Sequence, residues 1–579
     1  MRWKAAFSVV RAIRSKSSLS YVHAASSIPL IGDSIHAQFR ETTARLPDRP
    51  LFVFREQNVR KTYADVYSDV QRLAGGLLHL GLERGDRVAI WAPNHYEWVL
   101  TQLTAAAAGM VLVNLSPAYQ AAELKFALRK VGVKAIVLPR RHRRTDFYDI
   151  LAAAVPEIRA TGEGIGAICS GELPELKHAI LFGNHDGEKL RGVWSFDELM
   201  EAGGSTEEHE LNEIGRCIQP DDPANIEFTS GTTGNPKAVV LSHHNIVNNA
   251  NLTGLSLGFN QELSTVCIPN PLFHCFACVV GVVSSLIHGA TCVFPAASVI
   301  PERTIEAMSA EKCTTVYGTP TMMLDVLNVP TLHEYDLQST HTALVAGSPV
   351  PAALVAELTR RTALKNVVIG YGCTEMTTAV SLSRPTDPLA KRMATVGHVT
   401  PHLELSIQDA EGRILPRGQA GEICTRGYSR MRGYWNDPKA TTATISSGGW
   451  FHTGDVGCLN DDESLSVVGR LKDMIIRGGE NISPAEIEDL IAHHPLVRDV
   501  QVVGVPDDRM GEEVCAVVQL KAGGSLDEAQ LKAFCRERIS HYKCPRYVLF
   551  KPAAFFPRTP TGKIKKTCSR SGQPRKSSE

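Results

Sequence analysis

The sequence predicts an α/β fold, in which a large amino-terminal domain of layered sheets and helices precedes a small mobile α+β domain. From about residue 52 to residue 300, helical patterns alternate with short β-branched runs, as where YADVYSDVQRLAGGLLHLGL is followed by RVAIWA. AAAAGMVLVNL and KAIVLP repeat this alternation further along the chain. Such alternation is typical of a largely parallel sheet covered by helices.

The pattern changes after Gly469 to that of a smaller unit. DVQVVGV and EVCAVVQL are predicted to form two strands around the turn PDDRMGE. Ser483 to Glu486 resembles a capping box with proline at the first helical position, and Ser525 to Glu528 resembles a second box. The helix after the second box carries Leu531, Phe534 and Cys535 on one face.

These changes in pattern divide the chain into five segments. The stretch GRLKDMIIRGGEN is rich in charge and glycine, as expected of a joint between domains. We therefore expect a targeting segment at 1–32, the large domain at 33–469, a hinge at 470–473, the small domain at 474–566 and a polar basic tail at 567–579.

Composition limits the classes of function. Lys plus Arg and Asp plus Glu both number 61 in the 579 residues, so no overall field favours nucleic acid as a partner. The 14 cysteines have no regular spacing, and Cys275 and Cys278 lack the second pair that a zinc site requires. We expect buried free thiols in a reducing compartment.

The amino terminus has the composition of a mitochondrial transit peptide. It carries five basic residues and no acidic residue before Asp33, and apolar residues recur at helical spacing among its first 13 positions. A basic amphipathic helix of this kind directs proteins to mitochondria, and the mature protein is then expected in the matrix. An untargeted, frayed basic terminus is the alternative.

A long uncharged stretch lies between Glu262 and Glu302. Prolines interrupt it, and its unbroken part, CVVGVVSSLI, is too short to cross a bilayer. We expect a buried helix there and no transmembrane segment.

The stretch FTSGTTGNPKAVVLSHHN, residues 228–245, crowds glycines and hydroxyls around one lysine. Glycines let several backbone N–H groups point at one anion, hydroxyls add donors, and Lys237 adds charge, so the stretch suits phosphate oxygens. It is not a Walker A loop, because Ala238 rather than Ser or Thr follows the lysine. Taken by itself, a stretch rich in Gly and Thr is also compatible with an ordinary turn.

Four further motifs follow in order: YGCTE at 371–375, GWFHTGD at 449–455, GRLKD at 469–473 and PRTPTGKIKK at 557–566. Together with the glycine-rich stretch they resemble the adenylate-forming superfamily of acyl-CoA synthetases, luciferases and peptide-synthetase adenylation domains. The resemblance spans about residues 52–566. NPLFHC, YGTPTMMLDVLN and RGGENISPAEIED are most similar to the mitochondrial medium-chain fatty acyl-CoA synthetases of animals.

The resemblance implies a two-step reaction with ATP, Mg²⁺ and CoA. A carboxylate, here a medium-chain fatty acid, is joined to the α-phosphate of ATP with loss of pyrophosphate, and the CoA thiol then displaces AMP. Because two anions meet in the first step, its barrier is largely electrostatic.

The resemblance also assigns residues to the nucleotide. The β- and γ-phosphates are expected on Thr229, Ser230, Gly231, Thr232, Thr233, Gly234 and Lys237. Adenosine and the α-phosphate are expected on Ala346, Gly347, Ser348, Tyr371, Gly372, Asp455, Arg470 and Lys563. Tyr371 stacks on adenine and Asp455 accepts from the ribose hydroxyls in this scheme.

By the same resemblance, four residues carry the chemistry. Lys563 bridges the α-phosphate and the acyl carboxylate, Thr374 binds the α-phosphate, and Glu375 holds Mg²⁺. His274 lies at the acyl site, although a satisfied core histidine remains the ordinary alternative. Apolar segments around 317–323 and 396–399 line the acyl tunnel.

The small domain is expected to rotate about Lys472 between the two steps, which brings Gly478 and Gly479 toward CoA.

The sequence departs from the family at two places. Ala238 stands where glycine is usual, and it is strained only if that position needs a positive φ. The tail TCSRSGQPRKSSE lacks the usual apolar ending, which suggests weaker anchoring of Lys563.

Alternative functions therefore stay open: a catalytically weak, regulatory homologue that binds nucleotide or acyl chains, or an adenylating enzyme with another carboxylate substrate. A luciferase-like oxygenase and a peptide-synthetase module are further possibilities. The acyl chain length and the oligomeric state are left undetermined.

Overall fold

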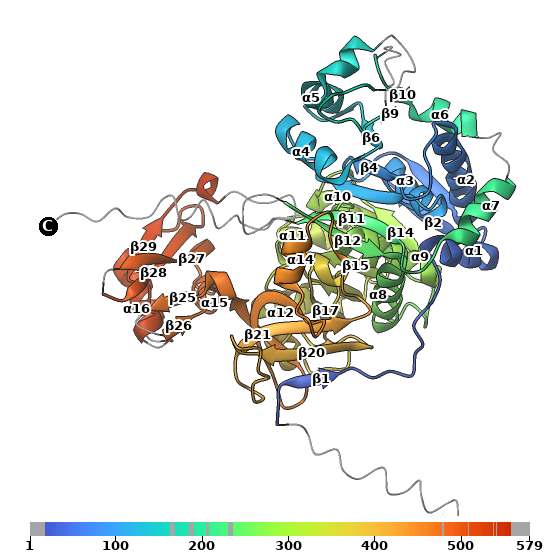
Figure 1. The fold of residues 1–579 in the computed structure, drawn as a ribbon. Coiled ribbons are helices and arrows are strands. Elements are labelled where there is room, and N and C mark those ends of the chain that lie inside the picture. The colour runs from blue at the N-terminus through green and yellow to red at the C-terminus, as the bar shows by residue number, and fades with distance from the viewer. Residues whose placement is uncertain are drawn as a thin grey trace, which may run out of the picture.

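The computed structural model describes residues 18–161, 168–183, 190–203, 208–229, 236–477, 480–507, 509–536, 538–539 and 541–556. A large domain of three sheets occupies the chain up to Arg470, and a small domain with its own sheet follows it (Figure 1).

The first large sheet has the strand order β10-β9-β6-β4-β5-β11-β12-β22. Its neighbours from β10 to β11 are parallel, whereas β12 and β22 are antiparallel additions at one edge. Its strands are β4 (Arg87–Trp91), β5 (Val111–Leu115), β6 (Ala135–Pro139), β9 (His178–Phe182), β10 (Trp194–Ser195), β11 (Pro223–Thr229), β12 (Lys237–Ser242) and β22 (Gly433–Tyr434).

The second large sheet has the order β19-β18-β17-β16-β15-β13-β14-β2-β3. It is parallel from β17 to β2 and antiparallel at both edges. Its strands are β2 (Pro50–Phe54), β3 (Val59–Thr62), β13 (Thr265–Cys267), β14 (Thr291–Phe294), β15 (Thr315–Gly318), β16 (Thr342–Val345), β17 (Asn366–Tyr371), β18 (Ser381–Leu382) and β19 (His398–Val399).

Helices form a central layer between the two large sheets. Val88 and Ile90 of β4 point to this central core, while their neighbours Ala89 and Trp91 point to the opposite face. This alternation follows from the two-residue period of a strand. The central layer contains α1 (Ile35–Arg45), α2 (Tyr63–His79), α3 (Tyr96–Ala107), α8 (His243–Ser256), a π-helix (Phe276–Val283) and α9 (Ser284–His288).

Further helices cover the outer faces of the two sheets. The first sheet is covered by α4 (Ala121–Val131) and α5 (Phe147–Ala154). The second is covered by α10 (Pro301–Ala310), α11 (Pro320–Leu327) and α12 (Ala352–Arg361). The remaining elements of the large domain are α6 (Phe196–Ala202), α7 (Glu208–Cys217), α13 (Leu389–Ala394), α14 (Pro438–Thr444) and the hairpin of β7 (Arg141–His142) and β8 (Thr145–Asp146).

The third sheet is antiparallel throughout and completes the large domain. Its order is β1-β20-β21-β23-β24, with bounds Tyr21–His23, Leu403–Gln408, Gly421–Gly427, Phe451–Leu459 and Leu465–Arg470. A 3₁₀ turn, Leu471–Asp473, leads from β24 into the small domain.

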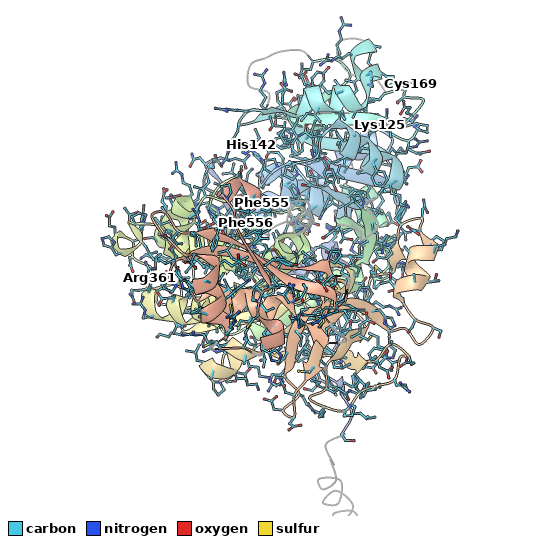
Figure 2. All side chains as sticks on the ribbon, turned by 90° about the vertical axis from the view of Figure 1, so that its left-hand side faces the viewer. Lys125, His142, Cys169, Arg361, Phe555 and Phe556 are labelled. Atoms are coloured by element: carbon cyan, nitrogen blue, oxygen red, sulfur yellow. The ribbon has the colours of Figure 1, made fainter. Side chains whose placement is uncertain are left out.

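The small domain packs helices against a sheet centred on β28. The strands are β25 (Ile475–Arg477), β26 (Glu480–Ile482), β27 (Val497–Asp507), β28 (Gly511–Leu520) and β29 (Tyr547–Phe550), and the helices are α15 (Pro484–Ala492) and α16 (Glu528–Arg536). On the other face of the sheet, the side chain of Phe556 is buried against Val503, Val505 and Val517. Figure 2 shows Phe555 and Phe556 at the edge of this domain, where the described chain ends.

The expected elements are present. YADVYSDVQRLAGGLLHLGL forms α2, RVAIWA forms β4, and the uncharged stretch forms the buried π-helix and α9. Every cysteine in the described ranges is free, and most of these are buried. No helix in these ranges is long and apolar enough to span a bilayer.

Both predicted capping boxes are wrong in detail. Ser483 occupies the N-cap of α15, but its side chain makes no capping bond and donates instead to the carbonyl of Val468 in β24. At α16, Asp527 accepts from the N–H of Gln530, and the Gln530 side chain accepts from the N–H of Asp527. The reciprocal pair of capping hydrogen bonds therefore begins at Asp527, because its carboxylate lies where it accepts the N–H of Gln530. The sequence pattern alone could not determine the first residue of this helix.

The correction at α16 gives a stability prediction. Asp527→Ala removes the carboxylate that caps the helix, and such losses cost about 1 kcal/mol, or about a fivefold change in the opening equilibrium. We expect faster amide hydrogen exchange in 528–536 for this variant. Ser525→Ala is the control, and an equal effect of both substitutions would contradict the assignment.

Candidate active site

Several of the predicted nucleotide residues follow two of three neighbouring parallel strands. β15, β16 and β17 lie side by side in the second sheet, so their carboxyl ends meet at one edge. Ala346 to Ser348 follow β16 directly, and Tyr371 to Glu375 end and follow β17. The N–H of Ala346 donates to the carbonyl of Gly318 at the end of β15. In open α/β sheets, ligands bind at this edge.

Tyr371, Asp455 and Arg470 form one connected group. The Tyr371 hydroxyl donates to Oδ2 of Asp455 at 2.8 Å, and Nε of Arg470 lies 3.0 Å from Oδ1. Burial, together with the charge of Asp455, raises the pKa of Tyr371 well above its ordinary value, so the phenol remains a donor. Asp455 and Arg470 are direct partners on β23 and β24. The group therefore links the second and third sheets at the end of β24, the strand that leads into the small domain.

A bulge in β23 aims Asp455 at this edge. The register between β21 and β23 shifts between Glu422 and Cys424, and Gly454 within the extra segment has a φ of +69°. The Glu422 carboxylate accepts from the N–H of Gly454 at 3.0 Å and lies 2.8 Å from Nδ1 of His452. Glu422 thus stabilises the bulge through hydrogen bonds to Gly454 and His452. β-Bulges often direct a side chain beside an active site.

Glu422, Cys424 and His452 also place one ligand-type atom each within 4.8 Å of one another. The Sγ of Cys424 lies 3.4 Å from Nδ1 of His452, and burial raises the pKa of this thiol. Because these groups contact one another and Gly454, we assign them to support of Asp455.

Lys237 and Glu375 meet through Tyr434. The Lys237 ammonium lies 4.7 Å from the centre of the Tyr434 ring, and the Tyr434 hydroxyl donates to Oε1 of Glu375 at 3.0 Å. In the described part of the chain, Glu375 makes no ion pair with a basic side chain. Glu375 is half-buried, and its second carboxylate oxygen is consequently suited to a hard cation such as Mg²⁺, which prefers carboxylate ligands.

Thr229 and Lys237 are direct partners across β11 and β12. They bracket the glycine-rich stretch, whose Ser230, Gly231, Thr232, Thr233 and Gly234 lie outside the described residues, as do Gly478, Gly479 and Lys563. Ala238 lies within β12, is fully buried and does not have a positive φ. The methyl group at this position therefore causes no backbone strain, and it packs in the core beneath the first sheet.

The YGCTE motif has a backbone that depends on glycine. A Cβ at Gly372 would lie 1.5 Å from the carbonyl oxygen of Thr378, so no other residue fits without movement of the turn. Thr377 and Thr378 both have positive φ values, of 53° and 91°. Such strain in non-glycine residues is typical of functional turns.

His274 lies next to the π-helix that separates the two large sheets. Its ring contacts the ring of Phe273, and the dense surroundings lower its pKa to about 4 although the side chain keeps some exposure. The imidazole is therefore neutral at physiological pH. Phe276 stacks on the buried Tyr317 ring at 5.7 Å, which places part of the expected tunnel segment beside this turn.

The structure brings Tyr371, Asp455 and Arg470 together, and it brings Lys237 close to Glu375. Sequence reasoning missed Tyr434, which contacts Lys237 and Glu375, and it missed Glu422 and His452 beside the bulge of Asp455. It also missed Glu227, which contacts Cys275 next to His274. His452 lies within the recognised GWFHTGD motif, so its position in that motif could have predicted a role at the site. The other contacts join segments distant in the sequence, so spacing alone carries no sign of them.

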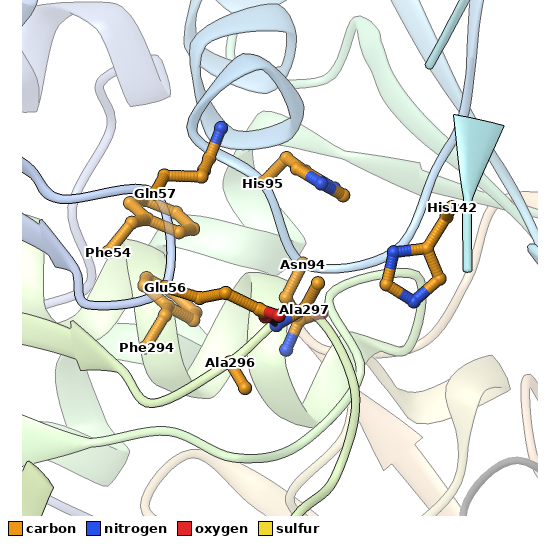
Figure 3. Close-up of a pocket in the computed structure, with 9 residues that line it drawn as sticks. All are labelled: Phe54, Glu56, Gln57, Asn94, His95, His142, Phe294, Ala296 and Ala297. Carbon is orange, nitrogen blue, oxygen red and sulfur yellow. Dashed lines mark hydrogen bonds between the residues drawn. The ribbon is translucent and has the colours of Figure 1, made fainter. Parts of the chain in front are cut away.

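A separate cavity of about 160 Å³ lies at the carboxyl ends of β2 and β14. Figure 3 shows its lining, which includes Glu56, His95 and His142. The carboxylate of Glu56 accepts from the N–H of Ala297 there. None of the predicted site residues lines this cavity, and we do not assign it to the nucleotide site.

A parallel sheet edge with the predicted nucleotide residues, supported by an antiparallel sheet and followed by a small second domain, is the arrangement of adenylate-forming enzymes. A solved structure described as anthranilate CoA ligase AuaEII in complex with anthranoyl-AMP has this fold, with a TM-score of 0.81, 25% identity, and coverage of 94% of this chain and 98% of that one. ATP-bound MatB from Rhodopseudomonas palustris matches with a TM-score of 0.79, 25% identity, and coverage of 93% and 99%.

The family models identify the chain more narrowly. The model of the AMP-binding enzyme matches residues 39–435, and that of the AMP-binding enzyme C-terminal domain matches residues 486–563. This chain belongs to the AMP-binding enzyme family.

Curated relatives are similar over nearly the whole chain. The protein named medium-chain acyl-CoA ligase ACSF2, mitochondrial, from Danio rerio is 43% identical over 94% of this chain and 89% of its own length. The human protein of the same name is 41% identical over 95% and 89%. A putative acyl-CoA synthetase, YngI, from Bacillus subtilis is 38% identical over 93% and 96%.

The support beneath Asp455 gives a prediction. Glu422→Ala removes the acceptor for Gly454 and the partner of His452, so we expect the bulge to relax and the KM for ATP to rise about tenfold. Initial rates at varied ATP, at saturating acid and CoA, measure this. Glu411→Ala is the control, because that glutamate is 63% exposed and ion-paired only on a hairpin of the same sheet. An unchanged KM for ATP in Glu422→Ala would contradict the supporting role.

Proposed function

We propose that this protein is an ATP-dependent fatty acid:CoA ligase, which forms an acyl-adenylate with release of pyrophosphate and then transfers the acyl group to CoA. The observation that carries the proposal is the group of Tyr371, Asp455 and Arg470 beside the pair of Lys237 and Glu375, at one edge of the parallel sheet. Its relatives, 41–43% identical and named medium-chain acyl-CoA ligases, favour a medium-chain fatty acid as the substrate.

ATP is bound across the sheet edge in this proposal. Adenine stacks on Tyr371 beside Ala346, Gly347, Ser348 and Gly372, while the ribose hydroxyls donate to Asp455, with Arg470 alongside. Thr229, residues 230–234 and Lys237 hold the β- and γ-phosphates and orient pyrophosphate as the leaving group. Donors fixed before the reaction begins stabilise developing charge without reorganisation.

The acyl carboxylate meets the α-phosphate beside Thr374 and Glu375. Mg²⁺ on the free oxygen of Glu375 neutralises phosphate charge when it is bound. Lys563 of the small domain bridges the two anions, and Phe556, buried on the small sheet, anchors the segment that leads to it. The acyl chain extends past the neutral imidazole of His274 toward Phe276 and Tyr317, because an uncharged wall suits an apolar chain.

The two steps need different arrangements of the small domain. Lys472 is exposed within the 3₁₀ turn between β24 and β25, where few packing contacts oppose a change of dihedral angles. Rotation there moves Lys563 away after adenylation and brings Gly478 and Gly479 toward CoA. The relatives named mitochondrial, together with the basic amino-terminal composition, favour action in the mitochondrial matrix.

One alternative rests on a specific observation. The solved structures with this fold include an anthranilate CoA ligase, so the fold also accommodates a carboxylate that is not a fatty acid.

The first test follows pyrophosphate and acyl-CoA separately. The purified full chain is given Mg-ATP, CoA and either straight-chain fatty acids of increasing length or aromatic acids. We expect both products with medium-chain acids, and we expect Lys563→Ala to slow pyrophosphate release by about 10²-fold or more, because transition-state charge loses its cation. Lys565→Ala, two residues away in the same motif, is the control. Turnover of aromatic acids alone would show that the substrate is an aromatic acid and not a fatty acid. ATP binding without release of pyrophosphate would overturn the proposed ligase activity.

The hinge is tested by Lys472→Pro. Proline fixes φ near −65°, so it restricts the dihedral change that the rotation requires. We expect thioester formation from preformed acyl-adenylate to slow by about tenfold or more, with a smaller effect on pyrophosphate release. Equal losses in the two half-reactions would count against rotation at this residue. A proline at another lysine, such as Lys439→Pro, is unsuitable as a control because Lys439 lies within α14. Lys472→Ala, which leaves φ free, is the matched control.

A further inference from the structure

Glu227 is a buried acid directly before the glycine-rich stretch. It lies in β11 two residues before Thr229, and its side chain is 2% exposed. Its Oε2 accepts from the N–H of Cys275 at 3.0 Å. Its Oε1 accepts from Nδ2 of Asn225 at 3.0 Å and from the Cys278 thiol at 3.4 Å.

The groups around this carboxyl are neutral or negative. Asn114 faces it from β5 and Val239 from β12, while Cys275 and Cys278 face it from the π-helical segment. Burial raises the pKa of both thiols, so they stay uncharged. In the described ranges no basic side chain forms an ion pair with Glu227.

Burial, together with the smaller effect of the Glu375 charge, raises the pKa of Glu227 to about 7. The cluster also has spare acceptors, because Oδ1 of Asn225 and Oδ1 of Asn114 are buried without a hydrogen-bond partner among the described residues. The two ends of an asparagine amide are interchangeable in a hydrogen-bond assignment. A rotated Asn225 amide presents its oxygen to Glu227 at the same 3.0 Å, where a protonated carboxyl donates to it.

Glu227 joins three parts of the proposed site. Its strand enters the glycine-rich stretch, and its partner Cys275 directly follows His274 at the start of the π-helix. The Sγ of Cys275 lies 3.8 Å from Oγ1 of Thr374 in the YGCTE motif. A shift of the Cys275 backbone therefore moves the acyl side of the site relative to the phosphate side.

We propose that Glu227 is a positioning residue that carries a proton in the active protein, and that this neutral carboxyl group fixes the His274–Cys275 turn to the strand entering the phosphate-binding stretch. Release of the proton to solvent places an uncompensated negative charge beneath the turn and ends the donation from Glu227 to Asn225, and this charge disfavours the approach of the acyl carboxylate. The catalytic consequence rests on the proposed function, whereas the protonation of Glu227 does not.

The first experiment compares melting temperatures of the full chain and Glu227→Gln from pH 5 to pH 8. Because the folded-state pKa of Glu227 lies above its unfolded value, the native protein holds a proton that the unfolded chain releases, and stability falls as the pH rises toward about 7. Glutamine keeps the acceptor for Cys275 and supplies a permanent donor, so we expect a shallower fall. Glu357→Gln is the control, since Glu357 lies on the exposed face of α12 beside Arg360. Identical pH dependence in the wild type and Glu227→Gln would overturn the proposal.

The second experiment measures fatty acid-dependent pyrophosphate release over the same pH range. We expect the wild-type kcat/KM for the acid to fall above about pH 7, in proportion to ionised Glu227, while Glu227→Gln keeps the value of the low-pH form. Glu227→Leu leaves the Cys275 N–H unpaired and is expected to raise the KM for the acid about tenfold at every pH, with ATP binding retained. A Glu227→Gln variant that loses activity at every pH would overturn the positioning role. If the wild type releases no pyrophosphate, the proposed function fails, and the melting comparison still decides the protonation of Glu227.

Discussion

The geometry of this site depends on the interaction of Asp455 with Tyr371 and Arg470. These residues come from β23, β17 and β24, so one carboxylate connects the parallel sheet, the antiparallel sheet and the strand that leads into the small domain. The carboxylate is buried on a bulge, and it is held there because Glu422 accepts from the N–H of Gly454 below it. Without that support the carboxylate loses its fixed position at the edge of the second sheet.

The charges at this edge are few and are distributed in a way that suits the joining of two anions. Lys237 lies against the face of Tyr434 rather than against an acid, so its charge remains available to phosphate oxygens. Glu375 is held by the Tyr434 hydroxyl and keeps one oxygen for a cation. Glu227, buried behind the same edge, avoids adding a negative charge by retaining its proton. The apolar side of the site has the neutral His274 and the stacked pair of Phe276 and Tyr317.

The periodicity of apolar residues predicted the helices and strands correctly, because it reflects directly which side chains are buried. Trp91 and Ile90 alternate between two cores, and α2 has its apolar face where the spacing predicts it. The ends of elements were harder to predict. Ser483 matches the sequence pattern of a cap, but its hydroxyl donates to the carbonyl of Val468 in another element. At α16 the capping residue is Asp527 and not Ser525. The concern over Ala238 also disappears in the structure, since a strand position requires no glycine.

The sequence by itself determined the family and the identity of the residues in its motifs, because those residues are consecutive and their chemistry is readable from side-chain type. Only the resemblance predicted that Asp455 lies with Tyr371 and Glu375, since no spacing connects the YGCTE motif at 371–375 with a residue so much further along the chain. The tertiary structure alone decided that Tyr434 connects Lys237 with Glu375, that Glu422 supports Asp455, and that Glu227 is buried without a cation. The physical reason is that sheet register and helix packing bring distant segments together, and a side chain acquires its protonation state and hydrogen-bond partners only from that environment.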